Sequence, residues 1–146
     1  MTDTRGDAPG AAFTWAGVAY PWQMDHMGHL NVQFYAALFD QATWAFFAEF
    51  GLDPAYLRES GCAMAAVSQH TEYRHEVFAG DVLEVHTQLL AVTEKTVRFL
   101  HTLRRRPQGE VVATSELVAA HLDRAVHRAV PLTEPVRGRL LARLHS

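Results

Sequence analysis

The alternation of apolar and polar residues changes its period near residue 61. Before that point, the stretch from Val32 to Phe50 contains no Gly or Pro, and its apolar side chains would cover most of a helical circumference. Gly51 follows at the position where a helix commonly ends. This pattern predicts a long and largely buried helix over residues 32–50.

After Gly61 the period becomes two, which is typical of β-strands. In residues 65–78, uncharged side chains alternate with a set that carries most of the charge, so we expect a strand covered on one side. The same alternation predicts further strands over 82–93, 96–105 and 111–122. Turn signals separate the strands at 79–81, 94–95 and 107–109. The order indicates four consecutive antiparallel strands.

The remaining segments predict less structure. Residues 12–20 are expected to form a strand, and residues 134–144 a terminal helix that Thr133 can cap, although Gly138 weakens it. Residues 1–11 are expected to form a flexible tail before a single domain over 12–146. Because the strands need a cover and helix 32–50 is the only large apolar element, we expect an α+β fold in which an antiparallel sheet wraps around a long central helix.

Composition limits the classes of function. The chain has 146 residues, of which 49% are hydrophobic and 20% charged, as in ordinary globular proteins. A net charge of -3 gives no general attraction for nucleic acid or anionic membranes. Cys62 is the only cysteine, so no disulfide can form within the chain. With no apolar run of membrane-spanning length and no hydrophobic signal region, we expect a cytoplasmic protein.

The segment before the predicted helix, YPWQMDHMGHLNVQFY (20–35), carries the candidate chemistry. Gly28 allows a tight backbone turn, and Asn31 can cap the helix. The first N–H groups of a helix have no partner within it, and the macrodipole makes that end partly positive. Asp25 is therefore either a nucleophile or base beside a site for a developing negative charge, or a carboxylate that merely stabilises a polar turn.

The chain resembles the hotdog fold, and more narrowly the 4-hydroxybenzoyl-CoA thioesterase-like family, over residues 13 to 132. Three patterns carry the resemblance: Asp25-x-x-Gly28-His29-Leu30-Asn31 with Tyr35 and Phe39, the turn Gly80-Asp81, and His121-Leu122-Asp123 leading to Val130-Pro131. The resemblance implies hydrolysis of acyl-CoA to a carboxylic acid and CoA. It assigns Asp25 as nucleophile or general base and the backbone N–H of Val32, seven residues later, as the main oxyanion donor. It also implies a homodimer or homotetramer with shared active sites.

Other residues of the motif are expected to contact the substrate: Gly28, His29, Trp22 and Tyr35. His29 has three interpretations, since it can orient Asp25 or water, contact the substrate, or satisfy a hydrogen bond in the turn. Asp25, His26 and His29 do not have the spacing of a metal motif, so we expect no metal site and no cofactor beyond the CoA of the substrate.

Several alternatives stay open. Asp40, within the predicted helix, is a second candidate for the catalytic carboxylate, although a structural role is also consistent with its position. Arg104, Arg105 and Arg106 form the densest basic cluster, which suits CoA phosphates or an ordinary turn. The alternative functions are a hotdog hydratase or dehydratase that uses Asp25 with His29, and an acyl-CoA-binding protein without catalysis.

Overall fold

The strands pair in an order that differs from their order in the sequence. The structure is a computed structural model and describes residues 10–107 and 109–146. Its strands are β1 (Ala12–Val18), β2 (Cys62–Tyr73), β3 (Val82–Val92), β4 (Thr96–Arg105), β5 (Glu110–Asp123) and β6 (Arg128–Ala129). They form one antiparallel sheet in the order β1-β3-β4-β5-β2, with β6 beside β5. The strands β3, β4 and β5 therefore form a central meander, and β1 and β2 lie at its two sides.

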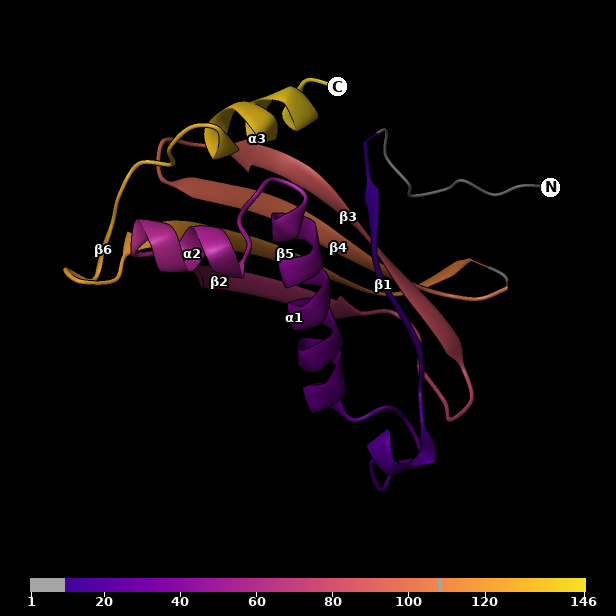
Figure 1. Cartoon of the computed structure of the whole chain (residues 1–146). Helices are drawn as coiled ribbons and strands as arrows, with labels where there is room; N and C mark the ends of the chain where they lie inside the picture. The colour runs from indigo at the N-terminus through magenta and orange to yellow at the C-terminus, as the bar shows by residue number, and fades with distance from the viewer. Residues whose placement is uncertain (1–9, 108) are drawn as a thin grey trace.

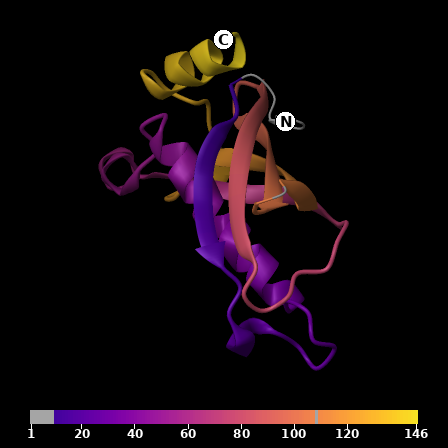
Figure 2. The same cartoon turned by 90° about the vertical axis from the view of Figure 1, so that its right-hand side faces the viewer.

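The long helix lies across one face of this sheet. The helices are η1 (Pro21–Gln23), α1 (Val32–Ala48), α2 (Pro54–Ser60) and α3 (Val136–Leu144). Figure 1 shows α1 and α2 in front of the curved sheet and α3 at its upper end. In the perpendicular view of Figure 2, β1 and β3 run side by side with α1 behind them. The predicted combination of an antiparallel sheet with a long helix against it is confirmed.

Two clusters of buried apolar side chains join α1 to the sheet. Near the carboxyl end of α1, Phe46 and Phe47 pack with Phe99 of β4 in one cluster. Near its amino end, Tyr35 and Phe39 belong to the other cluster. At roughly 25 cal/mol for each Å² of apolar surface removed from water, this burial supplies the main force that holds the helix in place.

A buried histidine links α1 to the strands between the two clusters. His101 is fully buried, with Nε2 2.8 Å from Thr43 Oγ1 and Nδ1 2.7 Å from Thr87 Oγ1. The Thr43 hydroxyl donates its only hydrogen to Phe39 O at 2.9 Å. Because Thr43 has no other hydrogen to donate, the His101 ring donates to it through Nε2–H. Burial lowers the pKa of His101 to about 3, so the ring is neutral.

The strand predicted over 65–78 differs most from the structure. β2 begins earlier and ends at Tyr73, and a bulge between Ala66 and Ser68 shifts its register against β5. As an edge strand it is largely exposed, and 60% of the Val67 surface is accessible. The expectation of one covered face is wrong because the bulge interrupts the alternation and residues 66–70 are exposed on both faces of β2.

Other boundaries shift by a few residues. The predicted helix over 32–50 ends at Ala48, while Gly51 adopts a left-handed conformation with φ 88° just beyond it. The terminal helix begins at Val136 and has no side-chain cap; the Thr133 hydroxyl instead lies 3.0 Å from the Tyr56 hydroxyl. The sequence did not predict α2, which Asp53 caps by accepting the Tyr56 N–H at 2.9 Å. Of the predicted tail and turns, residues 1–9 and 108 lie outside the described residues.

Candidate active site

Asp25 lies in a small loop that is closed by its own backbone. The Asp25 N–H donates to His29 O at 2.9 Å, and the Gly28 N–H donates to Asp25 O at 3.0 Å. Met24 and Leu30 form an antiparallel bridge at the base of the loop. Gly28 has φ 85°, a left-handed conformation that a side chain would disfavour. The predicted tight turn at Gly28 is confirmed.

One oxygen of the Asp25 carboxylate holds the loop, and the other has no partner among the described residues. Oδ1 accepts the Met27 N–H at 2.8 Å. Within the described part of the chain, no hydrogen bond or ion pair involves Asp25 Oδ2. The carboxylate is half-buried. It is therefore oriented through one oxygen and can use the other for chemistry.

The amino end of α1 also retains an unused polar group. Asn31 caps the helix as predicted, because its Oδ1 accepts the Gln33 N–H at 3.0 Å and its backbone oxygen accepts the Phe34 N–H at 3.0 Å. The Val32 N–H makes no hydrogen bond to any described residue. Since the macrodipole makes this end of α1 partly positive, a negative oxygen is stabilised there.

A single cavity brings Asp25 and Val32 together. It has a volume of about 370 Å³. Its lining residues come from the loop, from α1 and from the end of β2 with the segment after it: Asp25, His29, Leu30, Val32, Tyr35, Tyr73, Arg74, His75 and Glu76. The volume is near the lower end of the ~300–1,000 Å³ range of small-molecule sites.

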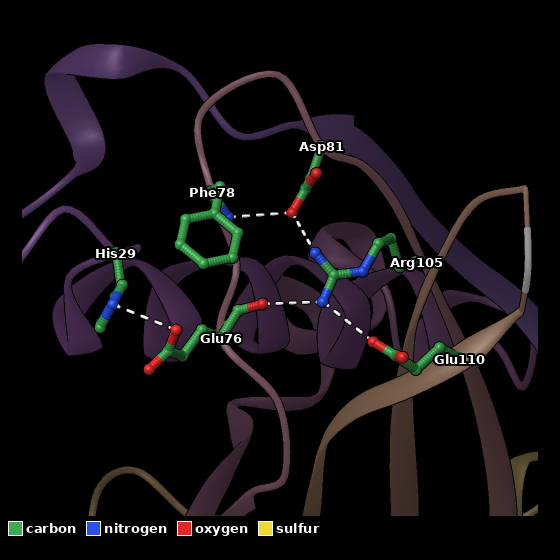
Figure 3. A network of polar contacts seen from close by, with 6 residues as sticks. All are labelled: His29, Glu76, Phe78, Asp81, Arg105 and Glu110. Carbon is green, nitrogen blue, oxygen red and sulfur yellow. Dashed lines mark hydrogen bonds and ion pairs between the residues drawn. The ribbon is translucent and has the colours of Figure 1, made fainter.

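The segment 74–81 carries one wall of the cavity, which its residues 74–76 line, and Arg105 holds this segment (Figure 3). The Arg105 guanidinium forms an ion pair with Asp81, donates to Glu76 O at 2.7 Å and contacts Glu110 Oε1 at 2.9 Å. Leu30 N–H, from the Asp25 loop, donates to Val77 O in this wall at 2.8 Å. The loop and the wall are therefore fixed to one another and to β4.

His29 contacts the wall instead of Asp25. Its Nε2 lies 3.2 Å from Glu76 Oε2, and its ring meets Phe78 edge-on with centroids 5.5 Å apart (Figure 3). Of the three interpretations of His29, orientation of Asp25 by its side chain does not match this geometry. The contact with substrate stays a prediction, and the His29 ring does line the cavity.

Tyr35 and Tyr73 form a second part of the lining. Their rings are nearly perpendicular, at 78°, with centroids 4.9 Å apart. Tyr35 is buried, whereas 52% of the Tyr73 surface is exposed. Burial, with the neighbouring Tyr73, raises the pKa of Tyr35 to about 12, so its phenol stays neutral.

Trp22 does not line the cavity, contrary to its predicted place beside the substrate. Its side chain is 71% exposed and meets Phe34 edge-on with centroids 5.3 Å apart. Trp22 lies in η1, where the chain turns before it reaches the Asp25 loop, and so the indole packs on the outer side of α1. Gly28 and Asn31 are also outside the lining, where they shape the loop and the helix end.

Asp40 belongs to a different cavity. It is exposed on α1 and lines a space of about 280 Å³ with Ala36 and Trp44 on the helix and Gln69 on β2. The expectation of a largely buried helix over 32–50 is wrong, because only one face of α1 packs on the sheet and Asp40 lies on the exposed face. The exposed face of α1 at this point removes the need for a buried partner.

The three consecutive arginines all bind protein groups. Arg104 is buried and donates to Gly109 O at 2.8 Å, and Arg105 makes the contacts described above. Arg106 Nη2 lies 2.6 Å from Glu84 Oε2, a contact that lowers the pKa of that carboxyl group. These contacts support the structural interpretation of the cluster over phosphate binding.

Sequence reasoning missed Tyr73, His75 and Glu76 as site residues. It assigned them to a strand that continues to Phe78, whereas the chain leaves the sheet after Tyr73. A signal was present, because three consecutive polar residues at 74–76 interrupt the alternation. In the described residues, no three His, Cys, Asp or Glu side chains group in a way that could hold a metal ion.

Comparison with known proteins identifies the family. The model of the thioesterase-like superfamily matches residues 20–140, which include the Asp25 loop, the cavity wall and the central meander of β3, β4 and β5. The chain belongs to this superfamily. The betainyl-CoA thioesterase of Pseudomonas aeruginosa is 34% identical over 126 residues, which cover 86% of this chain and 77% of that protein. The chain is accordingly an acyl-CoA thioesterase.

Solved structures show that this thioesterase has the hotdog fold. A DHNA-CoA thioesterase from Staphylococcus aureus superposes with a TM-score of 0.81 at 14% identity, covering 92% of this chain and 91% of that one. Another S. aureus protein, solved in complex with CoA, superposes with a TM-score of 0.86 at 18% identity, covering 92% and 85%. None of the helices in the described part of the thioesterase is long and apolar enough to cross a membrane.

Proposed function

We propose that Asp25 and the amino end of α1 together hydrolyse an acyl-CoA thioester to a carboxylic acid and CoA. One observation carries the proposal: a carboxylate oxygen and a helix N–H, each without a partner among the described residues, belong to residues that line the same cavity. Hydrolysis of a thioester requires a nucleophile or base and a donor for the developing oxyanion. The cavity supplies both without a cofactor other than the CoA of the substrate.

The proposed hydrolysis requires few other groups of the protein. Asp25 either attacks the carbonyl carbon itself, forming an anhydride that water then hydrolyses, or takes a proton from the water that attacks the carbonyl carbon. The carbonyl oxygen becomes negative and accepts a hydrogen bond from the Val32 N–H, strengthened by the macrodipole of α1. The thiolate of CoA leaves readily because thiols have a pKa of about 8.5.

Replacement of Asp25 by Asn tests the proposal. Asparagine retains an oxygen that can accept the Met27 N–H, so Asp25→Asn removes the charge and preserves the hydrogen bond of the loop. We expect thiol release, measured with a chromogenic thiol reagent, to fall about 10³-fold or more. Asp40→Asn is the matched control, because Asp40 lines a different cavity. Normal turnover by Asp25→Asn, or an equal loss in Asp40→Asn, would contradict the assignment.

The substrate is expected to be the CoA thioester of a small acyl group. A structural neighbour was solved with CoA, and the P. aeruginosa relative is a betainyl-CoA thioesterase. The modest volume of the cavity also favours a short acyl group over a long chain. We propose betainyl-CoA, whose acyl group carries a quaternary ammonium, as the first substrate to assay within a panel of acyl-CoA thioesters.

We also propose that the thioesterase assembles as a homodimer or homotetramer. β2 is an edge strand, and most of its residues are exposed, including Val67 and Tyr73. An edge of this length is usually paired with another chain or protected. Light scattering on the purified chain, whose mass is 16.3 kDa, should give two or four times that value. A monomeric mass across the assay concentrations would contradict the proposal.

A further inference from the structure

Two aromatic rings line the part of the cavity formed by α1 and the end of β2, and an acidic side chain lines the same cavity. Tyr35 comes from α1 and Tyr73 from the last position of β2, and their rings form a corner with centroids 4.9 Å apart. Glu76 follows three residues later and lines the same cavity. This arrangement combines aromatic surface with negative charge, which is the chemistry that binds organic cations.

The Arg105 guanidinium does not form an ion pair with the Glu76 carboxylate. Figure 3 shows that Arg105 reaches only the backbone oxygen of Glu76, while its guanidinium is bound by the carboxylates of Asp81 and Glu110. The Glu76 carboxylate itself faces His29, at 3.2 Å. The Glu76 carboxylate therefore contributes a negative charge to the cavity wall beside His29, and its side chain is 59% exposed there.

Arg74 is the arginine in the cavity lining. Its Nη2 lies 3.7 Å from Oε1 of Glu72, which is outside the lining. The two carboxylates of the lining, Asp25 and Glu76, outnumber this one arginine, so the field that a substrate meets in the cavity favours a cation. Tyr35 adds no charge, because burial raises its pKa to about 12. A neutral ring pair next to carboxylates suits a cation that cannot donate hydrogen bonds.

We infer that Tyr35, Tyr73 and Glu76 form a subsite for a quaternary ammonium on the acyl group of the substrate. The inference rests on the proposed function, since it places the acyl group beside Asp25. The trimethylammonium group packs against the two tyrosine rings, and the Glu76 carboxylate balances its charge. The thioester carbonyl then lies toward Asp25 and the amino end of α1. Tyr73 is a specificity-determining residue, because its ring contacts the cation and takes no part in the reaction.

A pair of substrates of equal shape tests the inference. Betainyl-CoA and 3,3-dimethylbutyryl-CoA differ only in the replacement of the quaternary nitrogen by carbon, so one acyl group is cationic and the other neutral. The measured quantity is the ratio of kcat/KM for the two substrates. The ammonium also makes its own thioester more reactive, but this intrinsic difference cancels when the ratio is compared between enzyme variants.

We expect Tyr73→Leu to lower this ratio about tenfold, which is within the range of a cation–π contact. Tyr20→Leu is the matched control, since Tyr20 is 53% exposed, close to the 52% of Tyr73, and lies outside the cavity lining. Tyr20→Leu should retain the ratio of the unmodified enzyme. Tyr73 is half-exposed at the end of an edge strand, so leucine is tolerated there; circular dichroism checks the fold of both variants.

Two results would overturn the inference. One is an unchanged ratio in Tyr73→Leu, including the case of an equal loss of activity on both substrates, which would mean that the ring only packs. The other is an unmodified enzyme that hydrolyses other acyl-CoA thioesters and not betainyl-CoA, which would leave the proposed function intact. An enzyme that hydrolyses no acyl-CoA of the panel would instead contradict the proposed function. Inhibition by trimethylglycine but not by 3,3-dimethylbutanoate would support the subsite independently.

Discussion

The two ends of α1 have opposite properties. At the carboxyl end, Phe46, Phe47 and Phe50 are buried in one cluster, and Phe47 O accepts the Leu52 N–H at 3.1 Å. At the amino end, the Val32 N–H has no partner among the described residues and opens on a cavity. The carboxyl end of α1 is therefore packed and hydrogen-bonded, whereas its amino end keeps an N–H group without a partner among the described residues.

The charged groups around the two ends of α1 also differ. Two arginines of α3 contact residues at the carboxyl end of α1. Arg143 Nη2 lies 2.6 Å from Glu49 Oε1, and Arg139 Nη1 donates to Phe50 O at 3.4 Å. Cations at this end complement the negative pole of the macrodipole. At the amino end no side-chain anion of the described residues is bound to Val32, so its positive pole remains available to a substrate oxygen. An unsatisfied polar group costs stability. The comparison therefore indicates that the carboxyl end supplies stability, and it supports the proposal that the amino end supplies the oxyanion donor.

Of the three predictions that test this comparison, Phe46→Ala should have the largest effect, on the stability provided by the carboxyl end of α1. Phe46 is fully buried against Phe50 and Phe99, so its truncation leaves a cavity in the core and should lower the free energy of unfolding by about 3–5 kcal/mol. Urea denaturation measures the change. Trp44→Ala is the control on the same helix, because the Trp44 side chain is partly exposed and should cost less. A lower kcat in the folded fraction of Phe46→Ala would show that the two ends are not separable.

Val32→Pro is expected to affect only the amino end of α1, through the loss of one N–H group. Proline lacks the N–H, but it suits the first position of a helix, and Asn31 already has the extended ψ of 140° that a residue before proline prefers. Loss of the oxyanion donor should lower kcat about 10²- to 10³-fold with little change in stability. Val32→Ala retains the N–H and isolates the effect of the side chain. Equal kcat values for the two variants would refute a role of this N–H.

The smallest expected effect concerns His101, between the two ends. Its pKa is lowered by burial to about 3 in the folded state, against about 6.5 when unfolded, so only the unfolded state binds a proton as the pH falls below 6.5. Stability should therefore fall by about 2 kcal/mol between pH 7 and pH 5 from this group. Urea denaturation at both pH values should show a weaker pH dependence in His101→Gln, and no such weakening in the control His145→Gln, where the side chain is exposed. An unchanged pH dependence in His101→Gln would mean that the ring is protonated in the fold.

The parts of the thioesterase that depend on neighbours in the chain can be predicted from the sequence. The helix from Val32, its Asn31 cap and the left-handed Gly28 turn all follow from local hydrogen bonds and backbone conformation. Residues 20–35 alone therefore indicate the Asp25 loop and the adjacent helix end. The meander of β3, β4 and β5 follows in the same way from alternation and turns.

The distant residues that complete the site are brought together only by the folding of the whole chain. β2 lies at the edge of the sheet beside β5. After Tyr73 the chain leaves β2 and passes the Asp25 loop, where Leu30 N–H donates to Val77 O. Arg105, eighty residues from Asp25, holds that wall through Asp81 and the Glu76 backbone. Alternation reports which face of a strand is buried, but it contains no information about which strand becomes an edge or where a bulge reverses the faces. The Asp25 motif is local and visible in the sequence, whereas the opposite wall of the cavity depends on long-range pairing.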